Sequence, residues 1–233
     1  MATTSMLTHG TLLVVFAAAA VPLGTTGAGV SRTFDGDPMG HPPPGFAFHV
    51  ARQTAPARWV VEREGANGFL AHRGDATGHT AFALAILDGA SPARVTVSAR
   101  IRLAGGQRSA GLVWRVQDPE NYYLARLDLD RQDIGLYRVA SGNRTRIDGE
   151  DDLELDVGAW HTLRIVQEDE NIRVYLGGIR VLRARDRTFA QAGAAGVWCA
   201  GDAIAHFDDL RVEAAGDKSG DRDDRDANSH RGR

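Results

Sequence analysis

The sequence predicts an all-β fold, an antiparallel β-sandwich or jelly roll. Short runs rich in β-branched and aromatic residues recur along the chain, and Gly, Asn, Asp or Pro residues separate them. No stretch shows a sustained helical period with caps. Many short strands at intervals of ~8–12 residues are typical of two packed antiparallel sheets.

The strands are expected where apolar and β-branched residues cluster. In chain order they are residues 58–62, 79–87, 94–103, 110–116, 122–128, 134–139, 160–167, 172–176, 195–199 and 205–212. Hairpin turns are expected at 118–121, 141–142, 169–171 and 177–178, because Gly and Asn tolerate positive φ and Pro presets the first turn residue. Pro42-Pro43-Pro44 predicts an irregular segment at a sheet edge, since proline cannot donate to a ladder.

The two ends of the chain differ in composition from its middle. Residues 11–23 are continuously apolar, too short for a membrane helix but long enough for a secretory signal, and Thr26-Gly27-Ala28 fits a cleavage site. We therefore expect a signal peptide over 1–28, a periplasmic or extracellular location and no membrane insertion after its removal. Residues 216–233 contain no large apolar side chain and mix acids with bases, which predicts a disordered tail. One β-sandwich domain is expected over 29–215.

Charge and cysteine content exclude several classes of function. The 27 Lys and Arg residues against 30 Asp and Glu residues give a formal net charge of −3, so no global basic field would attract nucleic acid. Cys199 is the single cysteine, which excludes an intramolecular disulfide and a cysteine-based zinc site. It lies in an apolar run, which favours a buried structural thiol over a reactive one.

The segment from Ala110 to Asp128 predicts a hairpin with two unlike faces. With Gln117 opposite Tyr122 across a four-residue turn, one face is apolar throughout and would form the core. Its members are Leu112, Trp114, Val116, Tyr123, Ala125 and Leu127. The other face would present Val113, Arg115, Tyr122, Leu124, Arg126 and Asp128. This register predicts that Trp114 contributes far more stability than Arg115.

The second face has the chemistry of a sugar site. An aromatic ring can cover the apolar face of a sugar, while Arg and Asp bind its hydroxyl groups. Arg115, Tyr122, Arg126 and Asp128 are therefore the candidate ligand-binding residues. The alternative is a half-exposed sheet on which the two arginines pair with Asp128.

Several motifs together resemble a known family of secreted bacterial proteins. They are Gly111-Leu112-Val113-Trp114-Arg115, Asp118-Pro119-Glu120-Asn121-Tyr122-Tyr123-Leu124-Ala125-Arg126, Leu136-Tyr137-Arg138-Val139, Trp160-His161-Thr162-Leu163-Arg164, Asp186-Arg187-Thr188-Phe189, residues 193–198 and Phe207-Asp208-Asp209-Leu210-Arg211-Val212. Over residues 34–212 the chain resembles the 3-keto-disaccharide hydrolase family, also described as family 16 glycoside hydrolase-like or domain of unknown function 1080. The resemblance implies a concanavalin A-like (laminin G-like) jelly roll and a saccharide or glycoside partner.

The chain also departs from the pattern of that family. Asp128 and Asp133 stand where asparagines are expected, and the loop around Asp202 lacks the expected lysine and hydroxyl groups. The resemblance therefore supports the fold more strongly than the activity.

Other possible sites carry weaker signals. Asp152-Leu153-Glu154-Leu155-Asp156 would place three acids on one face of a strand, either as glycosidase carboxyls or as the solvent face of an edge strand. His161 and His206 have no zinc-site spacing and are expected to be packed or half-exposed residues. No cofactor is expected and no metal ligand is assigned. One structural calcium ion remains an option if Asp35 and Asp37 converge with Asp208 and Asp209.

Three functions remain open from the sequence. The first choice is a secreted module that binds carbohydrate on one sheet face. The second is a glycoside hydrolase resembling the 3-keto-disaccharide hydrolases, whose catalytic residues the sequence does not identify. The third is a cell-envelope module that binds protein, which would need a broad apolar patch.

Overall fold

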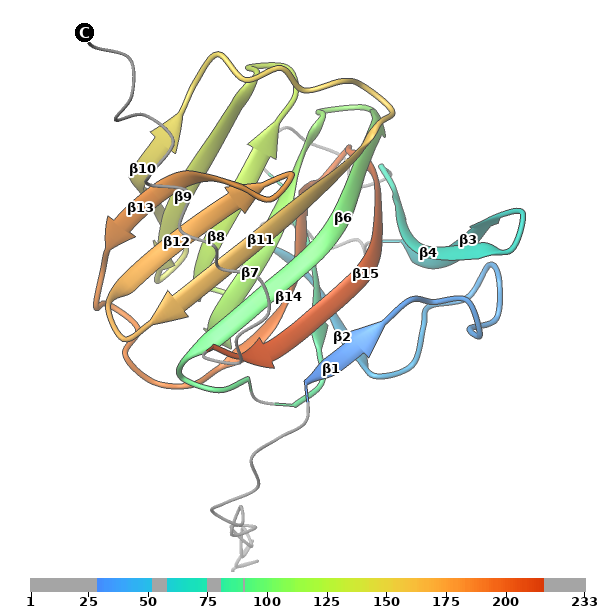
Figure 1. The fold of residues 1–233 in the computed structure, drawn as a ribbon. Helices are drawn as coiled ribbons and strands as arrows, with labels where there is room; N and C mark the ends of the chain where they lie inside the picture. The colour runs from blue at the N-terminus through green and yellow to red at the C-terminus, as the bar shows by residue number, and fades with distance from the viewer. Residues whose placement is uncertain (1–28, 52–57, 75–80, 90, 216–233) are drawn as a thin grey trace, which may run out of the picture.

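A computed structural model describes residues 29–51, 58–74, 81–89 and 91–215. The predicted signal peptide (1–28) and the predicted tail (216–233) lie outside the described residues, so both remain predictions. The described segments form fifteen strands in two antiparallel sheets and contain no helix. The all-β jelly-roll sandwich predicted from the sequence is confirmed (Figure 1). None of these segments forms a helix long and apolar enough to cross a membrane.

Sheet A has eight strands, and β1 (Val30–Arg32) adds to it by pairing with β15. Across this sheet the other seven strands are, in order, β13 (Ile179–Arg185), β12 (Asn171–Leu176), β11 (Trp160–Glu168), β6 (Val95–Gly105), β15 (Ile204–Ala214), β4 (Asn67–Arg73) and β3 (Trp59–Glu64). Strands β6 and β15 are the longest, and they pair along most of their length in the middle of the sheet.

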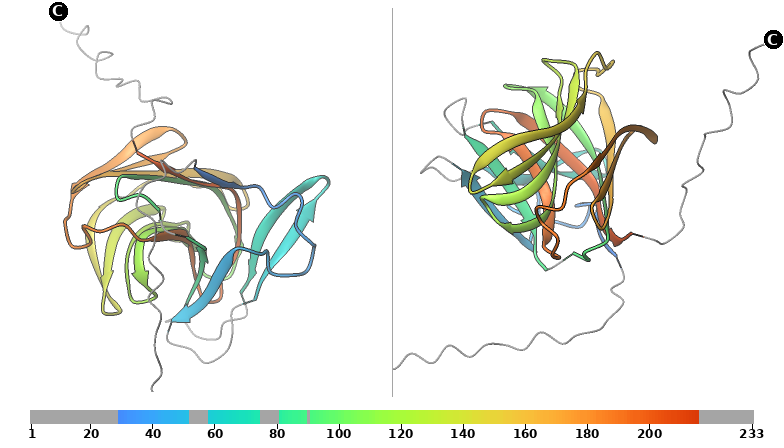
Figure 2. Two further views of the ribbon diagram at one scale, coloured as in Figure 1. Left: turned by 90° about the horizontal axis from the view of Figure 1, so that it is seen from below. Right: turned by 90° about the vertical axis from the view of Figure 1, so that its left-hand side faces the viewer.

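Sheet B has seven strands. Their order across the sheet is β10 (Asn143–Glu150), β9 (Asp133–Ala140), β8 (Asn121–Asp128), β7 (Ser109–Asp118), β14 (Ala194–Ala200), β5 (Phe82–Leu87) and β2 (Phe46–Ala51). The hairpin singled out in the sequence is thus β7–β8, near the middle of this sheet. Figure 2 shows that sheet B curves away from sheet A, so that its outer face is concave.

The main hydrophobic core lies between the two sheets. Along β6 and β15, buried residues alternate with more exposed ones, as expected for strands with one face toward the core. Trp114 on sheet B is fully buried there, and its Nε1 donates to Oε1 of Gln167 on sheet A at 2.5 Å. A polar group buried between the sheets has therefore found a partner on the opposite sheet.

The predicted strands correspond to ten of the fifteen that form. The other five are β1, β2, β4, β10 and β13, and β2, β10 and β13 are edge strands of their sheets. An edge strand pairs on one side only and buries less surface, which explains why the polar and mostly exposed β10 was missed. It does not explain β2, in which Phe46, Phe48 and Val50 alternate as in an ordinary strand. The segment Pro42-Pro43-Pro44 is irregular and leads into the edge strand β2, as predicted.

Candidate functional site

The β7–β8 hairpin keeps the predicted faces but not the predicted register. Asp118 pairs with Asn121 at the turn, and the next pair is Trp114 with Tyr123. Residues 115–117 therefore bulge opposite the single residue Tyr122. Beyond the bulge, the strands are shifted by two residues relative to the predicted register. Side chains alternate with a period of two, so this shift keeps the predicted core residues on one face. They are Leu112, Trp114, Tyr123, Ala125 and Leu127.

The predicted place of Arg115 on the sugar-binding face is wrong. Arg115 lies in the bulge with a φ of 48°, is only 1% exposed, and donates to three backbone carbonyl groups. The acceptors are Phe189 and Ala93, each at 2.5 Å, and Asp169 at 3.0 Å. Burial lowers the pKa of this guanidinium. Arg115 therefore joins three loops at one end of the sandwich and is removed from the candidate site.

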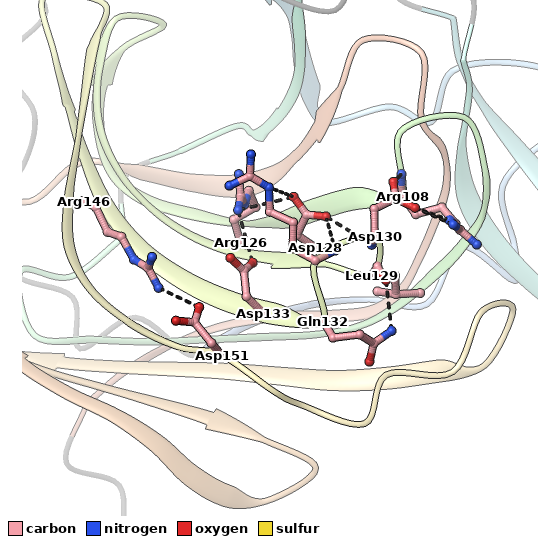
Figure 3. Close-up of polar contacts among 10 residues, drawn as sticks. Arg108, Arg126, Asp128, Leu129, Asp130, Gln132, Asp133, Arg146 and Asp151 are labelled. Atoms are coloured by element: carbon pink, nitrogen blue, oxygen red, sulfur yellow. Dashed lines mark hydrogen bonds and ion pairs between the residues drawn. The ribbon is translucent and has the colours of Figure 1, made fainter.

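Tyr122, Arg126 and Asp128 lie on the outer, concave face of sheet B. Nη2 of Arg126 is 3.3 Å from Oδ2 of Asp128 and 3.2 Å from Oδ1 of Asp133 on β9 (Figure 3). Asp133 is the cross-strand neighbour of Asp128. Asp128 Oδ1 in turn accepts from the backbone N–H groups of Asp130 and Arg131, both at 3.2 Å. One guanidinium thus lies between two carboxylates, and all three side chains are largely buried.

Trp198 and Phe82 form an aromatic wall next to this charged cluster. Trp198 on β14 pairs with Gly111 on β7, and Gly111 pairs with Arg126 on β8. Gly111 lies between Trp198 and Arg126 and, having no side chain, leaves the concave face open between them. The rings of Trp198 and Phe82 are 5.2 Å apart and tilted by 36°, a favourable aromatic contact.

Arg144 crosses the concave face from the far edge of the sheet. Its guanidinium carbon lies 5.1 Å from the ring centre of Tyr137 on β9 and 5.4 Å from that of Phe82 on β5. Four strands separate β10 from β5, which in a flat sheet would place these strands ~24 Å apart. The contact forms because the sheet is curved, and it divides the concave face into two cavities.

The two cavities share Phe82, Arg144 and Trp198 as common walls. The polar cavity, of about 430 Å³, is otherwise lined by Gln107, Ser109, Arg126, Asp128, Asp130, Arg131 and Ala200. The apolar cavity, of about 410 Å³, is otherwise lined by Val50, Pro119, Glu120, Tyr122, Leu124, Val139 and Gly142. We refer to the two together as the concave groove. Its total size is within the range of ordinary ligand sites.

Three buried polar atoms of residues that line the polar cavity have no hydrogen-bond partner. They are Oγ of Ser109, Nε of Arg126 and Nε1 of Trp198. Each of these residues is at most 6% exposed. A buried polar group without a partner costs about 1–3 kcal/mol, so the wall of this cavity is built at a cost in stability.

The weaker candidates from the sequence lie away from this groove. Residues 152–156 are irregular rather than a strand; Leu155 is buried and the three acids are exposed, so the solvent-facing interpretation holds. His161 is partly exposed, with Nε2 2.9 Å from the carbonyl oxygen of Asp156. His206 packs against Phe69 on the outer face of sheet A, with ring centres 4.8 Å apart.

The acids considered for calcium are held by protein groups. Asp35 accepts from the Gly68 N–H, and Asp37 pairs with Arg32. Both Asp208 and Asp209 pair with Arg100. Among the residues that the structure describes, no group of three or more His, Cys, Asp or Glu side chains is arranged to hold a metal ion. The convergence that a calcium site at these four acids would need is therefore not seen.

The sequence prediction missed several residues of the groove. Phe82, Ser109, Arg144 and Trp198 were not assigned to the site. Asp133, which pairs with Arg126 of the groove, was noted only as a departure from the family pattern. The sequence could have identified Trp198, because alternation along β14 places it on the face opposite the buried Cys199. Arg144 and Phe82 meet only through the curvature of the whole sheet, which no local pattern reveals.

Comparison with known proteins supports the fold. No protein-family model matches the chain, and no curated protein matches it. Among solved structures, carbohydrate-binding module CBM66 from Bacillus subtilis matches with a TM-score of 0.61 and 22% identity, over 72% of this chain and 95% of that one. Domain 4 of AbnA, a GH43 extracellular arabinanase from Geobacillus stearothermophilus solved in complex with arabinotriose, matches with a TM-score of 0.53 and 15% identity over 78% and 89%. The cellulose-induced protein Cip1 matches with a TM-score of 0.56 and 12% identity, over 79% of this chain and 97% of that one. At these identities the likeness shows a shared β-sandwich fold.

Proposed function

We propose that the protein binds carbohydrate in the concave groove of sheet B. The observation that carries this proposal is the polar cavity, in which the charged Arg126, Asp128 and Asp130 adjoin the aromatic Phe82 and Trp198. Sugar hydroxyl groups form hydrogen bonds with arginine and aspartate side chains, and the adjoining aromatic rings suit the apolar face of a sugar. Two of the similar solved structures, CBM66 and the arabinotriose-bound domain of AbnA, support the proposal by what their descriptions state.

Export to the periplasm or the medium forms part of the proposal. A binding site for a saccharide suits a protein that meets polysaccharide outside the cell, and residues 1–28 have the composition of a signal peptide. The mature chain is expected to begin near Gly29. Intact-mass measurement of protein from the periplasm or medium tests this, and a cytosolic product that retains Met1 would contradict it.

A glycoside hydrolase is the second candidate, and one observation favours it. Asp128 lines the polar cavity and Asp133 is its cross-strand neighbour, which brings two carboxyl groups together as in a glycosidase. However, the same Arg126 atom lies within 3.3 Å of both, so the two carboxylates are held in an ion pair with one arginine. The arrangement therefore favours binding over catalysis.

The protein-binding alternative has less support. Among the described residues, the large apolar side chains that are exposed are Val30, Met39, Val157, Ile179 and Ile204. They lie on separate loops and strands, so they do not form the broad patch that a protein interface would need.

Binding can be tested with three variants. A glycan array identifies a saccharide, and calorimetry then compares the wild type with Arg126→Ala and Trp198→Phe. A hydrogen bond to a charged group contributes ~1.5–3 kcal/mol, so Arg126→Ala should weaken binding by about tenfold or more. Arg183→Ala, an exposed arginine on the outer strand β13 of sheet A, is the matched control and should bind as the wild type does.

Two outcomes would redirect the proposal. If no glycan binds and Arg126→Ala only lowers the melting temperature, Arg126 is a structural ion-pair residue and the sugar-site proposal fails. If the wild type releases reducing sugar from 3-keto-glycosides, and Asp128→Asn or Asp133→Asn stops release while sparing binding, the hydrolase alternative replaces it.

A further inference from the structure

The outer face of sheet A carries a second polar surface, on the side of the sandwich opposite the concave groove. Strands β11, β12 and β13 lie side by side at one end of this sheet (Figure 1). Leu163, Ile172 and Val174 on these strands are completely buried in the core. Because side chains alternate along a strand, their neighbours Arg164 and Arg173 face outward.

Arginine side chains predominate on this surface. Residues 171–185 contain four arginines and no acidic residue, in a chain whose formal net charge is −3. Together with one arginine of β11 we call them the arginine surface, whose members are Arg164, Arg173, Arg180, Arg183 and Arg185. The three on β13 are exposed and the other two are partly exposed. The surface is therefore locally positive on a protein that is negative overall.

The pairing of the strands brings like charges together. Arg173 lies directly opposite Arg183 in the β12–β13 ladder. In a second row, Tyr175 on β12 lies between Arg164 on β11 and Arg180 on β13. Like charges directly opposite each other destabilise a sheet, so a bound anion would relieve an unfavourable interaction of the free protein.

The neighbouring acids are shared among several arginines. Glu168 and Glu170, in and beside the β11–β12 turn, each pair with two arginines. The ion pairs are Glu168 with Arg94 (3.1 Å) and Arg173 (2.8 Å), and Glu170 with Arg185 (3.9 Å) and Arg187 (3.1 Å). The next acid after β13, Asp186, accepts from Tyr123 and pairs with Arg138. Arg183 is a partner of none of these three carboxylates, so the positive charge is only partly balanced.

We propose that the arginine surface binds an acidic polysaccharide, whose carboxylate groups pair with the outward guanidinium groups. The inference goes beyond the proposed function, because it concerns a different surface and a ligand recognised by its charge. A guanidinium presents a planar fork of N–H donors that matches a carboxylate. A polymer with a carboxylate on each unit can pair with several arginines at once, so contacts that are individually weak add up.

The chemistry of the surface favours this partner over other polyanions. Tyr175 is 5% exposed, and the guanidinium carbon of Arg164 lies 3.9 Å from its ring centre. A covered ring cannot stack on a nucleic-acid base. A protein partner would need an apolar centre. Among the described residues of β11–β13, the exposed large apolar side chain is Ile179, at the start of β13 beside the hairpin turn rather than among the arginines.

The proposal is tested by calorimetry with a pair of matched ligands. The probe is a decamer of galacturonic acid, and its control is the same decamer with every carboxyl group methyl-esterified. The acidic decamer should bind at least about tenfold more tightly than the ester, which has the same sugar rings without the charges. Raising NaCl from about 50 to about 200 mM should weaken binding by about threefold or more, because salt screens exposed charges.

A double variant assigns the binding to the arginine surface. Arg180→Gln combined with Arg183→Gln should weaken binding of the decamer about tenfold, since two exposed ion pairs are lost. Arg73→Gln combined with Arg146→Gln is the matched control, because it removes two exposed arginines from β4 and β10 and changes the net charge equally. This control should bind nearly as the wild type does. If the double variant does not fold, Arg183→Gln alone replaces it and should weaken binding about threefold.

Several outcomes would overturn the inference. Failure of the decamer to bind, equal binding of the esterified decamer, or equal losses in the two double variants would show that the arginine surface recognises no acidic polysaccharide. Equally tight binding of poly-L-glutamate or of oligothymidylate would contradict the choice of a polysaccharide.

The inference and the proposed function can fail separately. Arg126→Ala should leave binding of the acidic decamer unchanged, and the Arg180→Gln, Arg183→Gln variant should leave binding of a neutral saccharide in the concave groove unchanged. If Arg126→Ala abolishes decamer binding, the acidic chain binds in the groove and the inference is wrong while carbohydrate binding stands.

Discussion

The indole N–H of Trp114 on sheet B donates a 2.5 Å hydrogen bond to the side-chain oxygen of Gln167 on sheet A. Both residues are completely buried, so the bond crosses the core and connects the two layers where neither group can reach water. The outer face of sheet B owes its position to such contacts, because the concave groove lies on the opposite side of the strands that Trp114 anchors.

Replacement of Trp114 by Ala should remove ~3–5 kcal/mol from the free energy of unfolding, because a large buried side chain is lost and a cavity remains. Trp114→Phe should cost less, ~1–3 kcal/mol, since the ring stays but Gln167 loses its donor. Urea unfolding followed by circular dichroism measures both. A loss below about 1 kcal/mol for Trp114→Ala would show that the residue does not lie between the sheets.

Arg115→Ala should be almost as destabilising as Trp114→Ala, contrary to the expectation from the sequence. The variant removes the donors of three carbonyl groups, and hydrogen bonds from a charged donor contribute ~1.5–3 kcal/mol. Arg115→Lys should recover little, because an ammonium group cannot reproduce the planar fork. The exposed Arg183→Ala is the control in the same urea experiment. Equal stability of Arg115→Ala and Arg183→Ala would refute the role assigned to Arg115.

His206 should make the fold less stable as the pH falls below about 6.5. Burial, and then the charge of Arg102, lower the pKa of His206 in the folded protein, and its Nδ1 accepts a hydrogen bond from Arg102 at 3.0 Å. Glu62 and Glu64 on β3 oppose this shift only in part. Since the folded pKa lies below the unfolded value, the neutral histidine stabilises the fold above about pH 6.5, and this contribution is lost as the pH falls toward the folded pKa.

The His206 effect can be isolated with one variant. Melting temperatures of the wild type and His206→Gln would be compared between pH 8 and pH 5. The amide oxygen of Gln can accept from Arg102 at every pH, so the variant should lose less stability across this range than the wild type. Parallel curves for the two proteins would contradict the assignment.

Cys199 should not react with thiol reagents in the folded protein. Its side chain is fully buried in β14, and burial raises the pKa of the thiol well above its usual value. Reaction with Ellman's reagent should therefore occur only after unfolding in guanidinium. Rapid stoichiometric labelling of native protein would show that the thiol is accessible.

The sequence predicted correctly those features of the fold that depend on the alternation of side chains along a single strand. The apolar face of the β7–β8 hairpin was predicted because residues two apart share a face, and even a two-residue error in register preserved it. Arg115 was misplaced because a bulge reverses the alternation locally, and neither Gly nor Pro marks it in the sequence. Edge strand β10 was missed because it is polar and mostly exposed.

The candidate site was predicted only in part for a related reason. Tyr122, Arg126 and Asp128 come from a single strand, so one pattern of alternation identified all three. Trp198 and Phe82 come from strands far away in the sequence, and Arg144 reaches Phe82 across four intervening strands. These contacts depend on strand order and sheet curvature, which arise from the packing of the whole sandwich.

The four tryptophan side chains offer the most direct test of the sugar site. Trp198 lines the concave groove, whereas Trp114 lies between the sheets, Trp59 lies in the core and Trp160 lies on sheet A. In a ¹H–¹⁵N spectrum, Trp198→Phe assigns its indole signal. Titration with the saccharide selected on a glycan array should shift the Trp198 indole signal with the same Kd as calorimetry reports, and should leave the other three indole signals in place. A shift of the Trp160 signal at saturation, with the Trp198 signal unchanged, would contradict a binding site in the concave groove.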